Sequence, residues 1–96
     1  MPDVWTHGKW TVRPGREEEF VQALGALARE ARDELGIDPP LLLRHREQPN
    51  VFLTFSSWPS EVDIERFREF LFPRLGPMRE LVESFEPHTL DEVSLD

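Results

Sequence analysis

Hydrophobic and polar residues alternate along residues 4–12, which predicts a β-strand with two different faces. One face carries Val4, Thr6, Gly8, Trp10 and Val12, and the other carries Trp5, His7, Lys9 and Thr11. A second strand over residues 51–58 has large apolar side chains on both faces: Val51, Leu53 and Phe55 on one, Phe52 and Trp58 on the other, with Thr54 and Ser56 between them. A sheet built from such strands has to be covered on both sides.

Helices are expected on either side of a hairpin. Apolar residues spaced by three or four predict a helix that begins near Arg16, has three glutamates in its first turn and closes at Gly36. Strands over 41–46 and 51–58 are joined by a turn at Pro49 and Asn50. A second helix starts at residues 59–61 and stops before Pro73, a third short helix covers 75–84, and a last strand covers 88–93.

This order, β-α-β-β-α-β, is typical of a ferredoxin-like α+β domain, with a four-stranded antiparallel sheet and helices on one face. Residues 1–96 form one domain in this interpretation. The uncovered face would expose Val51, Leu53, Phe55 and Trp5, an apolar patch that is large for a monomer. We therefore expect a homodimer formed through this open sheet face, with His7 and Lys9 at the interface.

Composition narrows the possible partners. The chain has 11 Lys and Arg against 19 Asp and Glu, a net charge of −8, which argues against nucleic acid or an anionic membrane surface as partner. It has no cysteine, which excludes disulfides, thiolate nucleophiles and cysteine-bound metal. No apolar run approaches the ~20 residues that span a bilayer, and the N-terminus lacks the pattern of a signal peptide, so we expect a cytoplasmic protein. A neutral or apolar small molecule fits this chain better as ligand.

Three stretches, residues 12–20, 49–60 and 85–90, together resemble the antibiotic biosynthesis monooxygenase family, whose members are dimeric α+β barrels. The resemblance implies oxygenation of a small aromatic, quinol-type or polyketide-derived substrate with neither metal nor flavin as cofactor. It also places Trp58 at a pocket between sheet and helices. Thr54 takes the position of an asparagine that polarises the substrate carbonyl in polyketide-oxidising members, and a threonine can donate one hydrogen bond there.

Two other functions stay open at this point. Some members of the family degrade haem with a first-strand asparagine and a histidine on the second helix. Here Gly8 occupies the first position and no histidine occurs between Arg46 and Pro87, so we do not expect haem degradation. A non-catalytic small-molecule-binding or accessory protein of the same fold is the stronger alternative, because the chain lacks tyrosine and a pocket asparagine.

The candidate site residues each have a structural interpretation as well. We expect Trp58 and Thr54 to orient a substrate oxygen, although Trp58 could simply fill the core. Gly8 would leave space beside Trp10, or mark a bulge. The remaining apolar candidates for the cavity wall, which also supply most of the core, are Phe52, Phe67, Phe70 and Met78, with Phe72 beside them.

The charged and titratable candidates are fewer. Arg79 could reach a ligand oxygen, but pairing with Glu83 one helical turn away is the simpler role. His7 and His88 belong to strands that should be neighbours, where hydrogen bonding at the interface or the strand edge is their expected role. No metal site is expected, because the three histidines lack ligand spacing.

Overall fold

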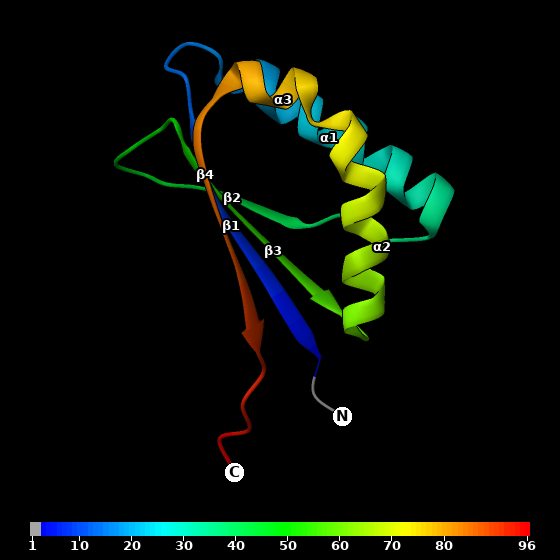
Figure 1. Ribbon diagram of the computed structural model, residues 1–96. Helices are drawn as coiled ribbons and strands as arrows, with labels where there is room; N and C mark the ends of the chain where they lie inside the picture. Colours follow the sequence, from blue (N-terminus) through cyan, green and yellow to red (C-terminus); the bar gives the residue numbers. More distant parts are fainter. Residues whose placement is uncertain (1–2) are drawn as a thin grey trace.

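The strand β1 (Val4–Val12) lies in the middle of a four-stranded sheet of order β2-β3-β1-β4. It pairs antiparallel with both β3 (Val51–Trp58) and β4 (Val82–Asp91), and β2 (Leu41–Arg44) pairs antiparallel with β3. The structure is a computed structural model that describes residues 3–96. Figure 1 shows the sheet nearly edge-on, with the helices to one side of it. The predicted ferredoxin-like α+β fold is confirmed.

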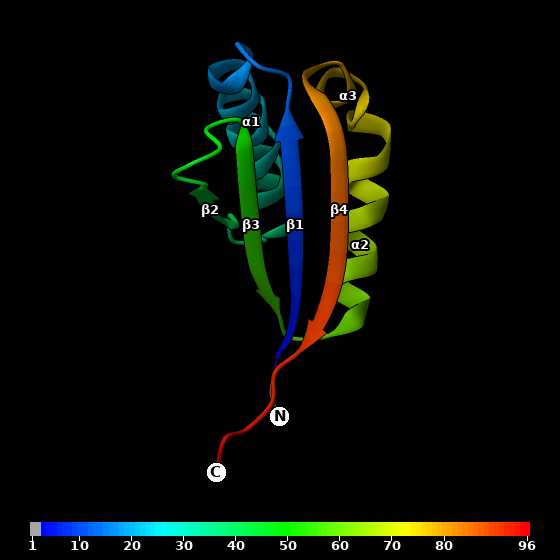
Figure 2. The ribbon, with the colours of Figure 1, turned by 90° about the vertical axis from the view of Figure 1, so that its left-hand side faces the viewer.

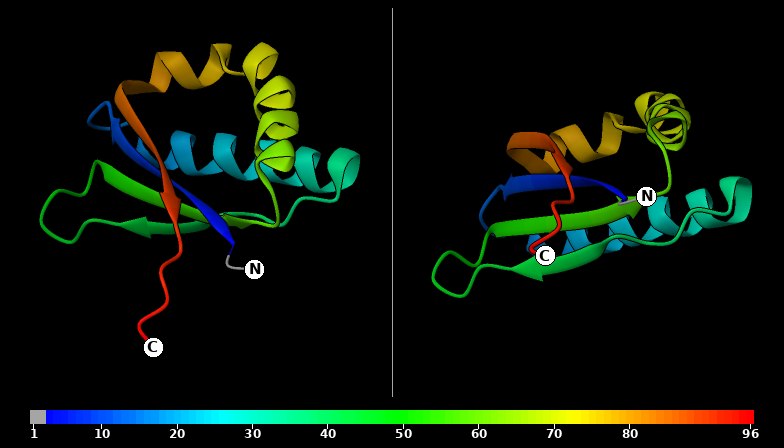
Figure 3. Two further views of the ribbon diagram at one scale, coloured as in Figure 1. Left: turned by 60° about the horizontal axis from the view of Figure 1, so that its bottom comes forward. Right: turned by 90° about the horizontal axis from the view of Figure 1, so that it is seen from below.

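The helices all lie on one face of this sheet, so that the other face is bare, as the view onto the strands in Figure 2 and the two views in Figure 3 show. They are α1 (Glu17–Leu35), α2 (Glu61–Leu71), the 3-10 turn η1 (Phe72–Arg74) and the short α3 (Gly76–Leu81). The predicted stop at Gly36 is confirmed, because Gly36 has a left-handed backbone with φ of 67°. No helix within residues 3–96 is both long enough and apolar enough to cross a membrane.

An aromatic core fills the space between the sheet and the start of α1. Phe20 is fully buried, and its ring centroid lies 5.4 Å from that of Trp10 and 5.1 Å from that of Phe52. Val12 and Met78 complete this buried cluster. At the same end of α1, Arg16 hydrogen-bonds Glu19 and thereby lowers the pKa of that carboxyl group. The core thus anchors α1 and α3 against the central strand.

Arg74 joins α1 to the end of α2. Its guanidinium contacts Glu30 (Nε to Oε2, 3.1 Å) and Glu34 (Nη2 to Oε2, 3.3 Å), both on α1. It also donates from Nη1 to the carbonyl of Phe70 at 2.7 Å and lies 3.9 Å from the centroid of the Phe70 ring. These contacts fix how α2 sits above the sheet.

The C-terminal part of the chain differs from the prediction. The third helix ends at Leu81 instead of residue 84, and the last strand begins at Val82 instead of residue 88. The Leu81 carbonyl accepts a hydrogen bond from the Arg13 N–H at 2.8 Å, so the chain is drawn alongside β1 at this point. Pro87 can lie within β4 because this strand is at the edge of the sheet. Glu83 is therefore in a strand, and the predicted helical pair with Arg79 does not form.

Two apolar side chains differ in exposure from the prediction. Phe72 is 72% exposed, because the η1 turn carries it out of the core. Val51 was expected to be exposed on the bare face of the sheet, but it is only 5% exposed. Its backbone is tied into the hairpin: its N–H donates to the Gln48 carbonyl, and its carbonyl accepts from the His45 N–H.

Candidate functional site

A cavity of about 380 Å³ lies between the covered face of the sheet and the helices. Its size falls within the range of sites that hold small organic molecules. Strands β1, β3 and β4 form one wall, and α1 and α2 form the other, together with residues 37–40. The helix side is mostly apolar, contributing among others Leu24, Leu27, Ala31, Ile64, Leu71 and Leu75. The arrangement suits an apolar ligand.

Five of the nine predicted site residues line this cavity: Trp58, Thr54, Gly8, Trp10 and Phe67. The other four lie elsewhere. Phe52 and Met78 belong to the buried cluster around Phe20. Phe70 is buried beneath Arg74, and Arg79 is an exposed residue of α3 outside the cavity lining. The structure thus brings together the predicted residues of β1 and β3, with Phe67 opposite them on α2.

The two indole groups of the cavity wall are already hydrogen-bonded within the protein. Trp58 Nε1 donates to Thr6 Oγ1 at 2.9 Å, and Trp10 Nε1 donates to Thr54 Oγ1 at 3.0 Å. The Thr54 hydroxyl in turn donates to the Gly8 carbonyl over a long 3.5 Å. Because these donors have partners, Trp10 and Trp58 offer the cavity their ring surfaces more than their N–H groups.

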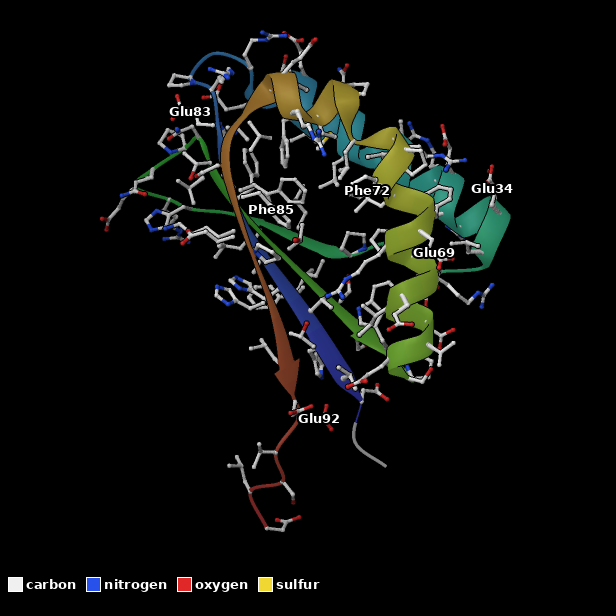
Figure 4. The ribbon with its side chains drawn as sticks, viewed as in Figure 1. Glu34, Glu69, Phe72, Glu83, Phe85 and Glu92 are labelled. Carbon is white, nitrogen blue, oxygen red and sulfur yellow. The ribbon has the colours of Figure 1, made fainter. Side chains whose placement is uncertain are left out.

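On the covered face of the sheet, side chains from β3 and β4 lie over the backbone of β1 at Gly8. A Cβ at this position would lie 2.6 Å from Phe85 Cε1 and 2.8 Å from Thr54 Oγ1, closer than real Cβ atoms come to other heavy atoms. The Phe85 ring packs against Trp10, with the ring planes tilted by 30° and the centroids 3.9 Å apart. Figure 4 shows Phe85 reaching from β4 toward the side of the sheet where the helices lie. Gly8 therefore provides the room for Phe85 and Thr54, which close over it.

Several lining residues were not among the predicted ones. Phe85 was not predicted in a strand, because the last strand was expected to begin only at residue 88, whereas β4 begins at Val82. Arg68 had a readable signal: it follows Ile64 by one helical turn, so both side chains leave α2 on one side. Ser56 alternates with Thr54 and Trp58 along β3 and therefore faces the same way. Asp38 lies in the connector between α1 and β2, where no periodic pattern applies.

The imidazole rings of the two sheet histidines meet on its bare face, although both residues also belong to the cavity lining. His7 and His88 are directly paired across β1 and β4, and their rings stack with centroids 5.8 Å apart. The His7 ring also lies 4.6 Å from that of Phe55, which alternation places on the face away from the helices. No group of three or more His, Asp or Glu side chains within residues 3–96 is placed to hold a metal ion.

The chain is thus an α+β domain with an aromatic-walled cavity between its sheet and its helices. The chain belongs to the antibiotic biosynthesis monooxygenase family, whose model matches residues 4–69. No curated protein shows significant sequence similarity to it.

Solved structures share the whole fold at low sequence identity. SnoaB from Streptomyces nogalater, a cofactor-independent oxygenase whose structure is that of a variant, superposes with a TM-score of 0.81 and 19% identity over 100% of this chain and 96% of its own. PA3566 from Pseudomonas aeruginosa superposes with a TM-score of 0.81 and 20% sequence identity, covering 98% of this chain and 97% of its own. A candidate antibiotic biosynthesis monooxygenase from Caulobacter crescentus CB15 superposes with a TM-score of 0.83 and 14% sequence identity, covering 97% of this chain and 92% of its own. These similarities establish the fold.

The close approach at Gly8 predicts a specific stability effect. Gly8→Ala should lower the free energy of unfolding by about 1–3 kcal/mol, because the new methyl group fits only if Phe85 and Thr54 shift. Urea denaturation followed by tryptophan fluorescence measures the change.

Gly25→Ala is the matched control, since its Cβ would meet only Arg29 Nη1 at an ordinary 3.6 Å within α1. This change should raise the stability by roughly 0.5–1 kcal/mol, the usual gain for alanine over glycine in a helix. Equal stability of the Gly8→Ala protein and the native protein would show that Phe85 does not pack over β1 as described.

Proposed function

We propose that this protein is a cofactor-independent monooxygenase that acts on a small aromatic substrate of the quinol, anthrone or polyketide type. The observation that carries the proposal is the cavity itself, whose aromatic surfaces come from Trp10, Trp58 and Phe67 on facing walls. Membership of the antibiotic biosynthesis monooxygenase family supports it. The shared fold with SnoaB, a cofactor-independent oxygenase, is consistent with the same chemistry.

The oxidation of an anthrone illustrates why no external reductant is needed. Its CH₂ group becomes a carbonyl, one atom of O₂ enters the product and the other leaves as water. The four electrons that O₂ accepts all come from the substrate carbon. The substrate anion has to form first, because only the electron-rich anion transfers an electron readily to O₂.

The roles we assign to the protein are binding and orientation. The Trp58 ring stacks on one face of the substrate, and its own position is fixed by the bond to Thr6 and by Phe67, 5.4 Å away between centroids. Thr54 contacts the substrate oxygen through its hydroxyl while it accepts the Trp10 N–H. The apolar helix side keeps water from the reacting carbon.

A second candidate function is binding without turnover. The observation that favours it is that both indole N–H groups and the Thr54 hydroxyl already have partners inside the protein. A wall of this kind is suited to sequestering an aromatic compound, and it leaves few groups free to move a proton.

Oxygen uptake distinguishes the two functions. We expect the purified, metal-stripped protein to consume O₂ above background with a panel of anthrones and dihydroquinones, and to place one ¹⁸O atom from labelled O₂ in the product. Trp58→Phe and Thr54→Val should each reduce the rate by about tenfold, equivalent to ~1.4 kcal/mol of lost transition-state stabilisation.

Trp5→Phe is the control for this experiment, because Trp5 lies on the bare face of the sheet and bonds Glu92 through its Nε1. It should retain the native rate. Tight binding of the panel without O₂ consumption would reject the monooxygenase in favour of the binding protein.

We also propose that a second copy of the chain covers the bare sheet face. Apolar side chains gather there although they are partly exposed: Leu41 is 60%, Leu43 44% and Leu90 43% exposed. The strand register places them around Phe55 and Trp5, since Leu41 pairs with Phe55 and Leu90 with Trp5. A patch of this kind is typical of a protein interface, and a sheet packed on its own copy makes that interface symmetric.

Phe55→Glu tests this interface. A buried, unpaired carboxylate on each side of a symmetric contact should convert the dimer to a monomer in sedimentation velocity, while circular dichroism stays native. Phe72→Glu introduces the same change at a phenylalanine that is 72% exposed on the helix side, and should leave the dimer intact. A dimeric Phe55→Glu protein would show that the copies meet elsewhere.

A further inference from the structure

Arg68 is the one arginine or lysine among the described residues that line the cavity. It lies in the last turn of α2, beside Phe67 and one turn after Ile64, which are also lining residues. Arg68 is exposed, so it stands where the cavity opens to solvent. A positively charged group is thus placed at the entrance of a site whose lining is mostly apolar.

The guanidinium of Arg68 has no hydrogen bond or ion pair with any residue of 3–96. Its neighbours along the chain are paired: Arg66 with Asp63, and Arg74 with Glu30 and Glu34. Arg29 and Arg79 also lack a side-chain partner within residues 3–96, so what distinguishes Arg68 is its place in the lining of the cavity. All of the N–H donors of Arg68 therefore remain available to a ligand.

One acidic residue also lines the cavity. Asp38 comes from the connector between α1 and β2, while Arg68 comes from α2, and the two side chains do not come within ion-pair distance of 4.0 Å. Neither side chain has an ion-pair partner among residues 3–96, so the cavity lining carries one charge of each sign, contributed by different elements. A ligand with an anionic end is attracted by Arg68 and repelled by Asp38, so the two side chains can be tested in opposite directions.

We propose that Arg68 is a specificity-determining residue that selects aromatic substrates bearing a carboxylate. The planar guanidinium matches a carboxylate through two parallel hydrogen bonds. The aromatic rings enter the cavity alongside Trp58 and Phe67, whose own rings contact each other with centroids 5.4 Å apart, and the carboxylate stays at the opening with Arg68. The inference rests on the proposed function in one respect, namely that the aromatic part of the substrate occupies this cavity.

A pair of probes that differ only in charge tests the proposal. Naphthalene-2-carboxylate and naphthalene-2-carboxamide have nearly the same shape, and calorimetric titration of the full-length protein measures their affinities. We expect the carboxylate to bind more tightly, and to lose affinity as salt is added. Arg68→Gln should weaken binding of the carboxylate by about three- to tenfold, within the range of a partly exposed charge pair. The affinity for the amide should not change. Asp38→Asn should strengthen carboxylate binding.

Arg29→Gln is the matched control, because Arg29 is exposed on α1, lies outside the cavity lining and makes no ion pair within residues 3–96. It changes the net charge equally and should not alter either affinity. If Arg68→Gln and Arg29→Gln lose carboxylate affinity equally, the loss comes from the overall charge of the protein, and the proposed role of Arg68 is overturned.

The remaining outcomes separate this inference from the proposed function. If both probes bind equally well and Arg68→Gln has no effect, the selection of a carboxylate is wrong while the aromatic cavity stands. If neither probe binds to the native protein, both the specificity and the proposed aromatic site are overturned. Circular dichroism of each variant verifies that it is folded.

Discussion

At Gly8 in the central strand β1, side chains from the two adjacent strands occupy the space that a side chain at this position would need. Phe85 comes from β4 and Thr54 from β3, and each would lie within 3 Å of a Cβ on Gly8. Trp10 completes the group, because it packs against the Phe85 ring and donates its indole N–H to Thr54. One missing side chain thus fixes how three strands present their aromatic groups, and with them one end of the cavity.

The two faces of the sheet have separate roles, and strand register keeps them apart. Side chains alternate along β1 and β3, so the cavity residues Gly8 and Thr54 are paired, as are His7 and Phe55 on the bare face. A slip of one residue would move every cavity side chain to the other face. The interaction at Gly8 opposes such a slip, since any other residue of β1 at that point would bring a Cβ into Phe85. The same contact therefore preserves both the cavity and the proposed dimer surface.

Much of the fold could be predicted from local signals. The bounds of β1 and the end of α1 at Gly36 follow from alternation and from a glycine that takes up a left-handed backbone. The start of β4 could not be predicted in this way, because it depends on the long-range hydrogen bond between the Arg13 N–H and the Leu81 carbonyl. The outward turn of Phe72 has a similar origin, since η1 interrupts the helical spacing on which its predicted burial was based.

The site was predictable in its strands but less so in its helices. Alternation alone assigns Gly8, Trp10, Thr54 and Trp58 to one face, and all four line the cavity. Periodicity on α2 cannot separate Phe67, which faces the cavity, from Phe70, which Arg74 covers. That difference depends on how Arg74 ties α2 to Glu30 and Glu34 on α1, and hence on packing between distant segments.

The distribution of polar groups around the cavity has a consequence for binding. Inside, the two indole N–H groups are bonded to threonine hydroxyls, so an aromatic ring can enter without leaving these buried donors unpaired. A site with paired walls discriminates poorly among aromatic molecules, because stacking and apolar contact depend mainly on size. Discrimination then has to come from unpaired polar groups, and a charged side chain on α2 can supply it without disturbing the packing of the sheet. The cavity interior would thus set the size of the ligand, and its opening the charge.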